Sequence, residues 1–325
     1  MRKKISLAII GCGNIASSHI EAFNKLGLST NHCASRLNST KVKRFATKYK
    51  IKNVWKDPVK LAKNSKSWDG IVLSSSTKSI PKILEILIKQ KKPVLVEKPV
   101  SIGTKYLSKF KLNSPKFVSV GFNRRFYNTV VEAKKFVKES KGQVLCNMKL
   151  PVFVKRKNSE IKKFNNIFEN AVHGIDALRY IFGDLEVIYK NKIRLNNFDS
   201  GRFAVLKSKK KHICNLIINS NSPDNFSLEI ENGIERLLLK PFEKCEIFRG
   251  IAVKEPNKKY PLRSYSPKLI RSSHVFEGMK KFKNIKPGFF KQGINFYNKI
   301  CGSKTKSSAN LTDAYKAQKI LETIM

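Results

Sequence analysis

The stretch that decides the fold is Ile5-Ser6-Leu7-Ala8-Ile9-Ile10-Gly11-Cys12-Gly13-Asn14-Ile15-Ala16, close to the N-terminus. Residues 5–10 form a short apolar run that suits a buried strand of a parallel sheet. Residues 11–16 then read G-x-G-x-x-A, and the apolar positions after them fit one side of a helix that ends near Gly27. Strand, glycine turn and helix in this order are the context that a dinucleotide-binding fingerprint requires. A signal peptide is the alternative interpretation, but the apolar run is at the short limit for one.

Each position of this turn has a physical task in holding a dinucleotide. Gly11 permits the tight turn, Gly13 leaves the backbone open to the pyrophosphate, and Ala16 lets the helix approach the strand closely. The N–H groups at the start of the helix, from Asn14 and Ile15 onward, favour the negative charge of a phosphate. We therefore expect Gly11, Gly13, Asn14 and Ile15 to bind the pyrophosphate of NAD or NADP.

The alternation of strands and helices continues to about residue 122. Apolar runs predict strands at 30–35, 54–55, 70–73, 93–96 and 117–120, and amphipathic patterns predict helices at 42–49 and 80–89. This order indicates an α/β fold with a doubly wound parallel sheet, so we assign residues 1–122 to an NAD(P)-binding Rossmann domain. A chain of 325 residues, 41% of them hydrophobic, has room for a second domain at residues 123–325.

The end of the second strand discriminates between the two cofactors. Proteins that select NAD usually carry Asp or Glu there, which binds the ribose hydroxyls. This chain reads Ala34-Ser35-Arg36, with no carboxylate to repel a 2′-phosphate and an arginine to hold one. The pattern favours NADP, with Ser35 and Arg36 as contacts; the alternative is that Arg36 stacks on the adenine and both cofactors bind. Ser74 and Ser75, after the fourth strand, are further expected cofactor contacts.

Glu97-Lys98-Pro99 directly follows the predicted strand at 93–96. Ligands of doubly wound sheets bind at the carboxyl ends of the strands, so this tripeptide is well placed for chemistry. Pro99 restricts the backbone of Lys98 and thereby fixes where its ammonium group points. We expect Glu97 and Lys98 to lie at the cofactor; the alternative is a strand that ends in an ordinary charged turn.

The net charge of +43, from 66 Lys and Arg against 23 Asp and Glu, is unusually basic. The basic residues are spread from end to end, and the short cluster at 207–211 is accompanied by no nucleic-acid-binding motif. We therefore expect no specific nucleic-acid partner. The charge indicates either a solvated basic surface or a field that gathers anionic substrates such as phosphates.

The six cysteines form no C-x-x-C pair, and their spacing suits neither a disulfide scaffold nor a zinc site. Free cysteines in a chain of this size are typical of a reducing cytoplasm, where we expect the protein to reside. The scattered histidines predict no metal site, and no apolar run reaches the roughly 18 residues of a membrane span.

Several motifs together resemble the glucose-fructose oxidoreductase, inositol dehydrogenase and MocA (Gfo/Idh/MocA) family. They are Gly11-x-Gly13-x-x-Ala16, Glu97-Lys98-Pro99 and Gly121-Phe122-Asn123-Arg124-Arg125-Phe126, in this order and spacing. The resemblance continues at His173-Gly174-Ile175-Asp176 and in the last helix, from Leu311-Thr312-Asp313-Ala314 onward. These motifs are specific for the family, and none of them is specific for a substrate.

The resemblance implies a Rossmann domain followed by an α+β domain with an open, mostly antiparallel sheet that often mediates oligomers. It also implies that the last helix packs back on the Rossmann domain. The residues of the second half agree, because strand patterns occur at 143–151, 186–195, 203–207, 212–219, 226–230 and 236–240, with a helix at 166–182. Asn232-Gly233 is typical of a hairpin turn. We expect a homodimer or homotetramer.

Glu169 and His173 are four residues apart in the predicted helix and therefore share one face. A carboxylate and an imidazole in this arrangement can form an acid–base pair, although ordinary surface charge pairs look the same in a sequence. Asp176, three residues further on, can lie on the same side, and we expect it to support the acid–base pair from behind; a purely structural role is the alternative.

The resemblance implies specific roles for these residues. Lys98 would donate a hydrogen bond to the substrate oxygen, and His173 would take the hydroxyl proton as the nicotinamide takes the hydride. Glu169 stands where the family usually has aspartate, and it would either orient His173 or contact a substrate hydroxyl. Asn123 and Arg125 would lie near the cofactor or substrate.

Two departures concern the substrate pocket. Many family members carry a histidine in the loop after the fourth strand, where this chain has 74–79 without one. Many also have glycines before the helix with the acid–base pair, where this chain has the bulkier Lys163-Phe164-Asn165-Asn166. The pocket is therefore expected to have an unusual shape.

The function that these features predict is that of an NAD(P)-dependent oxidoreductase. It would transfer a hydride between nicotinamide and a secondary alcohol or ketone of a sugar, a cyclitol or a sugar derivative, including phosphate- or nucleotide-linked sugars. Two alternatives are a relative that cleaves glycosides through transient oxidation, and a non-catalytic regulator that only binds the cofactor.

Overall fold

The computed structural model describes residues 5–36, 39–155, 159–196, 199–277, 285–303, 305 and 307–325. The chain divides into two compact units. The first unit comprises residues 1–126 and 279–322, and the second comprises residues 127–278 and 323–325. Within the described ranges, no helix is long and apolar enough to cross a membrane.

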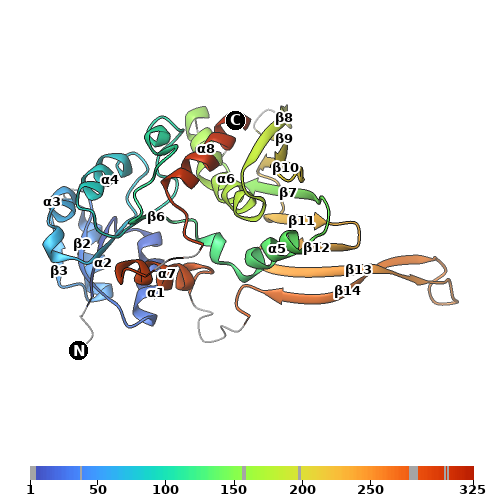
Figure 1. Cartoon of the computed structure of the whole chain (residues 1–325), viewed down its shortest axis with the longest axis horizontal. Coiled ribbons are helices and arrows are strands. Elements are labelled where there is room, and N and C mark those ends of the chain that lie inside the picture. The colour runs from blue at the N-terminus through green and yellow to red at the C-terminus, as the bar shows by residue number, and fades with distance from the viewer. Residues whose placement is uncertain are drawn as a thin grey trace. The chain divides into compact units, whose positions relative to one another are not determined.

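The first unit is built on a sheet of six parallel strands in the order β3-β2-β1-β4-β5-β6 (Figure 1). The order reverses between β1 and β4, which is the topological switch point where doubly wound sheets bind their ligands. Its strands are β1 (Ser6–Ile10), β2 (Ser29–Ala34), β3 (Asn53–Trp55), β4 (Gly70–Leu73), β5 (Val94–Val96) and β6 (Val118–Val120). Its helices are α1 (Asn14–Lys25), α2 (Thr40–Tyr49), α3 (Pro58–Lys63), α4 (Ile80–Lys89) and α7 (Phe289–Ile300), together with most of α8 (Leu311–Ile324).

The apolar runs of the sequence explain this core. Leu7 and Ile9 of β1 are almost fully buried, and they pack with Ile20 and Phe23 of α1 and Phe296 of α7. Burial of both sheet faces is typical of parallel strands, which therefore show continuous apolar runs instead of alternation. The predicted α/β fold with a doubly wound parallel sheet is confirmed.

The second unit contains an eight-stranded sheet in the order β14-β13-β12-β11-β7-β10-β9-β8. Neighbouring strands are antiparallel except β7 and β10, which are parallel. The elements are α5 (Asn128–Glu139), β7 (Leu145–Val152), α6 (Glu160–Phe182), β8 (Leu185–Arg194), β9 (Ser200–Ser208), β10 (Ile213–Ser220), β11 (Ser227–Glu231), β12 (Glu235–Leu239), β13 (Lys244–Lys254) and β14 (Ser264–His274). The expected open, mostly antiparallel sheet is confirmed.

Side chains alternate between the two faces of this sheet. Met148 and Leu150 of β7 are buried on the face that carries α5 and α6, whereas their neighbours Asn147 and Lys149 are exposed (Figure 1). The strand β10 alternates in the same way between buried and half-buried residues. One face therefore holds the core of the unit, and the other face presents partly exposed side chains.

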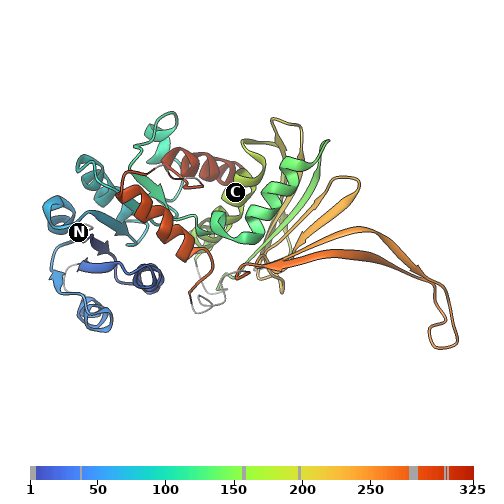
Figure 2. The same ribbon diagram turned by 60° about the horizontal axis from the view of Figure 1, so that its bottom comes forward.

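The predicted strands at 226–230 and 236–240 correspond to β11 and β12, and the turn at Asn232-Gly233 joins them. Gly233 has a φ of 85°, and the Oδ1 atom of Asn232 accepts from the N–H groups of Ile234 and Glu235. The sequence did not predict β13 and β14, which form a long hairpin that extends beyond the other strands of the sheet (Figure 2).

Candidate functional site

The glycine turn lies at the carboxyl end of β1, next to the loop that follows β4. Gly11 has a φ of 97°, and its N–H donates to the carbonyl of Ala34 at 2.8 Å. A Cβ atom at Gly11 would lie 2.4 Å from the backbone oxygen of Ser74, so both the conformation and the packing require glycine. Ser74 uses its hydroxyl to join the two loops, donating to the carbonyl of Gly11 at 2.9 Å.

Gly13 is the N-cap of α1, and its surroundings differ from those of Gly11. A Cβ atom at Gly13 would meet no atom of the described residues within 4 Å. The first turn of α1 contains no acidic residue, and the first intrahelical bond runs from the Ser17 N–H to the Gly13 carbonyl at 3.2 Å. The N–H groups of Asn14 and Ile15 precede that bond and therefore point out of the helix end. Open space beside an uncapped helix N-terminus fits the pyrophosphate of a dinucleotide.

Cys12 sits between the two glycines, and its Sγ lies 3.5 Å from the carbonyl oxygen of Ala34. A hydrogen bond with Cys33 is the largest cause that raises the pKa of the Cys12 thiol well above its ordinary value, and burial adds to it. Cys12 is therefore a neutral thiol at physiological pH and serves the packing of the turn.

The residues expected to select the cofactor follow β2. Ser35 is half-buried and Arg36 is exposed, and the Arg36 carbonyl accepts from the Ser39 N–H at 3.2 Å. Both residues directly follow Ala34, whose carbonyl binds the glycine turn. Their part in NADP selection stays a prediction.

The second serine of the loop after β4 belongs to a chain of hydroxyl groups. Ser79 donates from its Oγ to the Oγ of Ser75 at 3.0 Å and lies at the same distance from the Oγ of Ser76. This arrangement orders the loop ahead of α4, at the same sheet edge as the glycine turn.

Glu97, at the end of β5, is buried and bound on both carboxylate oxygens. Its Oε1 lies 2.7 Å from Nε2 of His19, and its Oε2 accepts from the Lys98 N–H at 3.3 Å. A Cβ atom at Gly121 would lie 2.7 Å from the Glu97 Oε1, so this glycine makes room for the carboxylate. Glu97 thereby holds the backbone that presents the half-buried Lys98.

Sequence reasoning missed His19. It is 1% exposed on the inner face of α1, and its ring packs edge-on against Phe289 with the centroids 4.9 Å apart. The only available signal was a histidine at a core-facing helical position after the glycine turn, and its partner is 78 residues away in the sequence.

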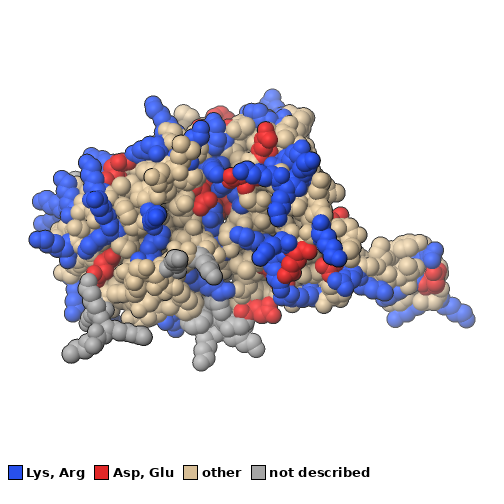
Figure 3. Space-filling model, viewed as in Figure 1, with Lys and Arg blue, Asp and Glu red and all other residues tan. Residues whose placement is uncertain are grey.

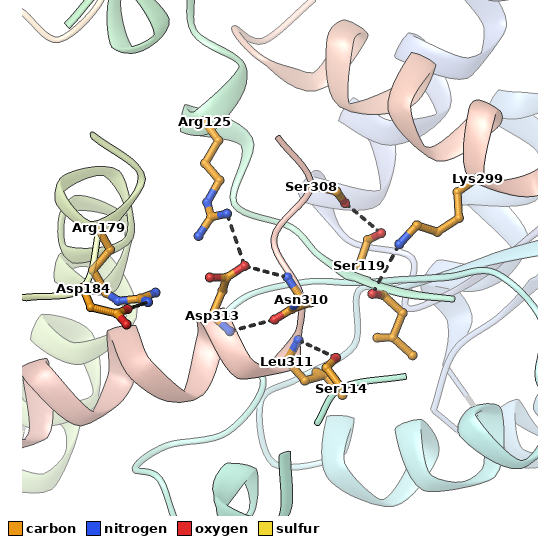
Figure 4. Close-up of polar contacts among 11 residues, drawn as sticks. Ser114, Ser119, Arg125, Arg179, Asp184, Lys299, Ser308, Asn310, Leu311 and Asp313 are labelled. Carbon is orange, nitrogen blue, oxygen red and sulfur yellow. Dashed lines mark hydrogen bonds and ion pairs between the residues drawn. The ribbon is translucent and has the colours of Figure 1, made fainter. Parts of the chain in front are cut away.

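Asn123 and Arg125 follow β6 and form contacts within the first unit. Asn123 donates from Nδ2 to the carbonyl of Pro287 at 3.0 Å. Arg125, with 7% of its side chain exposed, places Nη1 3.3 Å from Oδ2 of Asp313 (Figure 4). Asp313 also accepts from the Asn310 N–H, while Asn310 Oδ1 accepts from the Asp313 N–H, a reciprocal capping box at the start of α8.

Glu169 and His173 are both half-buried on α6 and one helical turn apart. Gly174 explains how the helix reaches its position, because a Cβ atom there would lie 2.5 Å from Cδ2 of Leu150 on β7. The helix therefore approaches the sheet closely at Gly174. Asp176 is 1% exposed.

The structure thus brings the predicted residues together in two groups. In the first unit, the glycine turn, Ser74 and Glu97-Lys98 follow β1, β4 and β5 at the carboxyl edge of one sheet. In the second unit, α6 carries Glu169 and His173. A parallel sheet with a glycine turn at its switch point defines the class of dinucleotide-binding Rossmann proteins.

Comparisons with known proteins extend this assignment. Residues 5–111 match the model of the Gfo/Idh/MocA oxidoreductase family, described as an NAD-binding Rossmann fold. A myo-inositol 2-dehydrogenase of Thermotoga maritima is 25% identical over 186 residues, which is 55% of each chain. The chain thus spans about half the length of this curated relative.

Solved structures share the fold over nearly the whole chain. An oxidoreductase of Thermotoga maritima superposes with a TM-score of 0.76 at 18% identity, covering 99% of this chain and 96% of the other. Levoglucosan dehydrogenase, in complex with NADH and levoglucosan, gives 0.78 at 12% identity, covering 98% and 95%. Over residues 5–111 the chain matches the Gfo/Idh/MocA oxidoreductase family, which confirms the resemblance seen in the sequence.

Proposed function

We propose that this protein is an NAD(P)-dependent dehydrogenase or reductase that acts on a CH–OH group of a sugar, a cyclitol or a sugar derivative. The observation that carries the proposal is the uncapped, unobstructed N-terminus of α1 at the switch point of the sheet. Lys98 follows β5, which is the next strand but one to β1 in the sheet, so it lies at the same sheet edge as that turn. The inositol and levoglucosan dehydrogenases among the similar proteins support a polyol or sugar substrate.

A bound nicotinamide dinucleotide supplies the acceptor or donor of the hydride. The N–H groups at the start of α1 bind its pyrophosphate, and Arg36 binds the 2′-phosphate that distinguishes NADP from NAD. In the direction of oxidation, Lys98 donates a hydrogen bond to the substrate oxygen, and His173 accepts the hydroxyl proton as the hydride leaves the carbon. Glu169 orients His173, and Glu97 positions Lys98 through the backbone N–H of that lysine.

Asn123 and Arg125 act indirectly in this mechanism. Their hydrogen bond to Pro287 and ion pair with Asp313 fix the chain segment that leaves β6. We propose that they shape the edge of the site.

The first experiment is a titration with NADPH and NADH at moderate salt, followed by nucleotide fluorescence. We expect NADPH to bind more tightly than NADH, and Arg36→Ala to lose that preference. Lys138→Ala is the matched control, because it removes an exposed cation from α5 and leaves the Rossmann domain unchanged. If neither nucleotide binds at millimolar concentration, the proposal fails; if both bind equally before and after Arg36→Ala, only the NADP preference fails.

The second experiment screens sugars and cyclitols for absorbance change at the nicotinamide band, with the Lys98→Ala, His173→Ala double variant as the control. A substrate that the wild type oxidises and the double variant does not would support the assigned chemistry. Release of an aglycone without net change in nicotinamide absorbance would favour glycoside cleavage instead. A double variant that retains the biological activity would favour a non-catalytic regulator.

We further propose a cytoplasmic homo-oligomer, dimeric or tetrameric, that associates through the open face of the second unit's sheet. Partly exposed apolar residues on that face, such as Phe203 and Ile217, support this. Lys and Arg side chains are scattered over the visible surface in Figure 3 instead of forming one patch. Because the net charge is +43, repulsion between protomers is expected to weaken association at low salt. Light scattering at two salt concentrations would measure both effects.

A further inference from the structure

A cavity of about 720 Å³ lies in the second unit, where the first turns of α6 cross the ends of β8, β9 and β10. Phe164 and Ile167 of α6 line it on the side of the helix that faces the sheet. At 100° per residue, Glu169 and His173 lie about 140° and 180° around the helix from Phe164. The cavity is therefore separate from the predicted acid–base pair.

Four cationic side chains line this cavity. They come from Lys163 on α6, Lys192 and Arg194 on β8, and Arg202 on β9. Lys192 and Arg202 are directly opposite each other in the register of β8 and β9. Like charges in directly paired positions of a sheet repel each other, so this pair of cations is electrostatically unfavourable.

Arg202 is the central member of this set. It is 6% exposed, and its Nη1 donates to the Ser200 Oγ at 2.8 Å. Its Nε is buried and has no hydrogen-bond partner within the part of the chain that the structure describes. Burial lowers the pKa of the Arg202 guanidinium, and the nearby charge of Glu160 partly opposes this. A buried guanidinium with an unused donor is costly unless an anion accepts from it.

The two acidic residues of the cavity do not balance these cations. Glu160 has 88% of its side chain exposed and is paired with Lys163 at 2.7 Å. Asp199 accepts from the side-chain amides of Asn196 at 3.1 Å and Asn221 at 2.6 Å. Glu160 also attracts the Arg202 guanidinium, but the four cations outnumber the two carboxylates, so the lining keeps an excess of positive charge.

The rest of the lining fits a small organic anion. Ser220 accepts from the Ser200 N–H at 2.9 Å and donates to its carbonyl, so the hydroxyl groups form a polar floor. Val154 and the three apolar residues Ile161, Phe164 and Ile167 of α6 form walls. A volume of a few hundred Å³ or more is typical of sites for small molecules and exceeds what one inorganic anion fills.

We propose that this cavity binds the phosphoryl group of a small phosphorylated metabolite, with Arg202 as the principal ligand and Lys192 and Lys163 as further contacts. The planar guanidinium offers paired donors that match phosphate oxygens, and the apolar walls hold the organic part. The site is additional to the proposed cofactor and substrate sites and does not depend on them.

The test measures binding calorimetrically with three probes at constant ionic strength: inorganic phosphate, glucose 6-phosphate and glucose. We expect the two phosphates to bind and glucose alone not to bind. Tighter binding of glucose 6-phosphate than of phosphate would show that the walls hold an organic group, whereas equal affinity would identify free phosphate as a sufficient ligand. Failure of both phosphates to bind at 10 mM would overturn the proposal.

Three variants locate the binding. Arg202→Gln should weaken phosphate binding by about tenfold or more, since it removes charge-assisted hydrogen bonds. Lys192→Gln, which changes an exposed member and leaves the buried arginine, should weaken it by about threefold. Lys207→Gln is the control, because Lys207 is an exposed cation on the same strand and on the opposite face. Circular dichroism of each variant verifies folding.

An unchanged affinity in both Arg202→Gln and Lys192→Gln would place the phosphate elsewhere and refute the site. An equal loss in Lys207→Gln and Lys192→Gln would show that binding reflects net charge alone. Either result is distinguishable from misfolding, because Lys192 and Lys207 are exposed and their replacement leaves the core intact.

Discussion

Among the helix N-termini of the first unit, those of α1 and α8 differ in their capping. The α8 N-terminus carries the Asn310–Asp313 capping box, and Asp313 also pairs with Arg125. The α1 N-terminus begins at Gly13, and within the described residues it has neither a side-chain cap nor an acidic residue in its first turn. The capped end satisfies its own N–H groups and stabilises the fold. The uncapped end lies at the switch point of the sheet, where its N–H groups are placed for a ligand.

The largest effect on both stability and cofactor binding is expected from Gly11→Ala, because the turn that presents the N-terminus of α1 depends on Gly11. The new Cβ atom would lie 2.4 Å from the Ser74 backbone at a φ of 97°. We expect a loss of about 3 kcal/mol or more in the free energy of unfolding, together with loss of NADPH binding. Urea denaturation and nucleotide titration measure the two effects. A variant as stable as the wild type would mean that the turn and the loop after β4 separate easily.

Gly13→Ala separates binding from stability. Since a Cβ atom there meets nothing described within 4 Å, we expect the free energy of unfolding to change by less than about 0.5 kcal/mol. The affinity for NADPH should nevertheless fall by about tenfold to a hundredfold, because the methyl group occupies the approach of the pyrophosphate. Unaltered affinity would contradict the assignment of this helix end to the cofactor.

The capped end gives the complementary result. Asp313→Ala should destabilise the protein by about 2 kcal/mol, because it removes the carboxylate that accepts from the Asn310 N–H and leaves Arg125 without this carboxylate. Asp57→Ala is the matched control, since Asp57 caps α3 through the Val59 N–H at 2.7 Å and should cost only about 1 kcal/mol. NADPH affinity should stay at the wild-type value in both variants. An equal loss of unfolding free energy in Asp313→Ala and Asp57→Ala would show that the ion pair with Arg125 does not contribute to stability.

A smaller effect is expected at the C-terminal end of α7. Lys299 donates to the carbonyl of Lys116 at 2.9 Å, and burial lowers its pKa to about 8. The unfolded chain therefore binds one more proton than the folded chain between about pH 8 and 10.5, so this group makes stability rise with pH in that window. We expect Lys299→Met to remove about 1 kcal/mol of that rise. Parallel curves of unfolding free energy against pH for both proteins would contradict this.

The first unit could be predicted from the sequence because its signals are local. Residues 5–26 contain the strand, the glycines and the helix in one continuous segment, and each is specified by neighbours in the chain. Contacts between distant segments could not be predicted in this way. His19 and Glu97 meet across 78 residues, and Arg125 meets Asp313 across 188. A polar residue that is satisfied by such a partner looks like any other polar residue in the sequence.

The second unit shows a different limit. The predicted helix at 166–182 begins six residues earlier, at Glu160, where polar residues and the exposed Ile161 conceal the amphipathic pattern. The strands β13 and β14 escaped prediction because most of their residues are exposed, so their two faces do not differ in polarity. The backbone hydrogen bonds that pair exposed strands do not depend on residue type, so the sequence does not reveal them.

The hairpin of β13 and β14 has a further consequence. Beyond Gly250 its residues are exposed or half-buried, so its outer half can open without exposing the core to water. Amide hydrogens between about residues 251 and 267 should therefore exchange with solvent much faster than those of β7 or β10. Residues 255–263, at its tip, are a suitable place to insert a peptide tag or a protease site while the sheet keeps its structure.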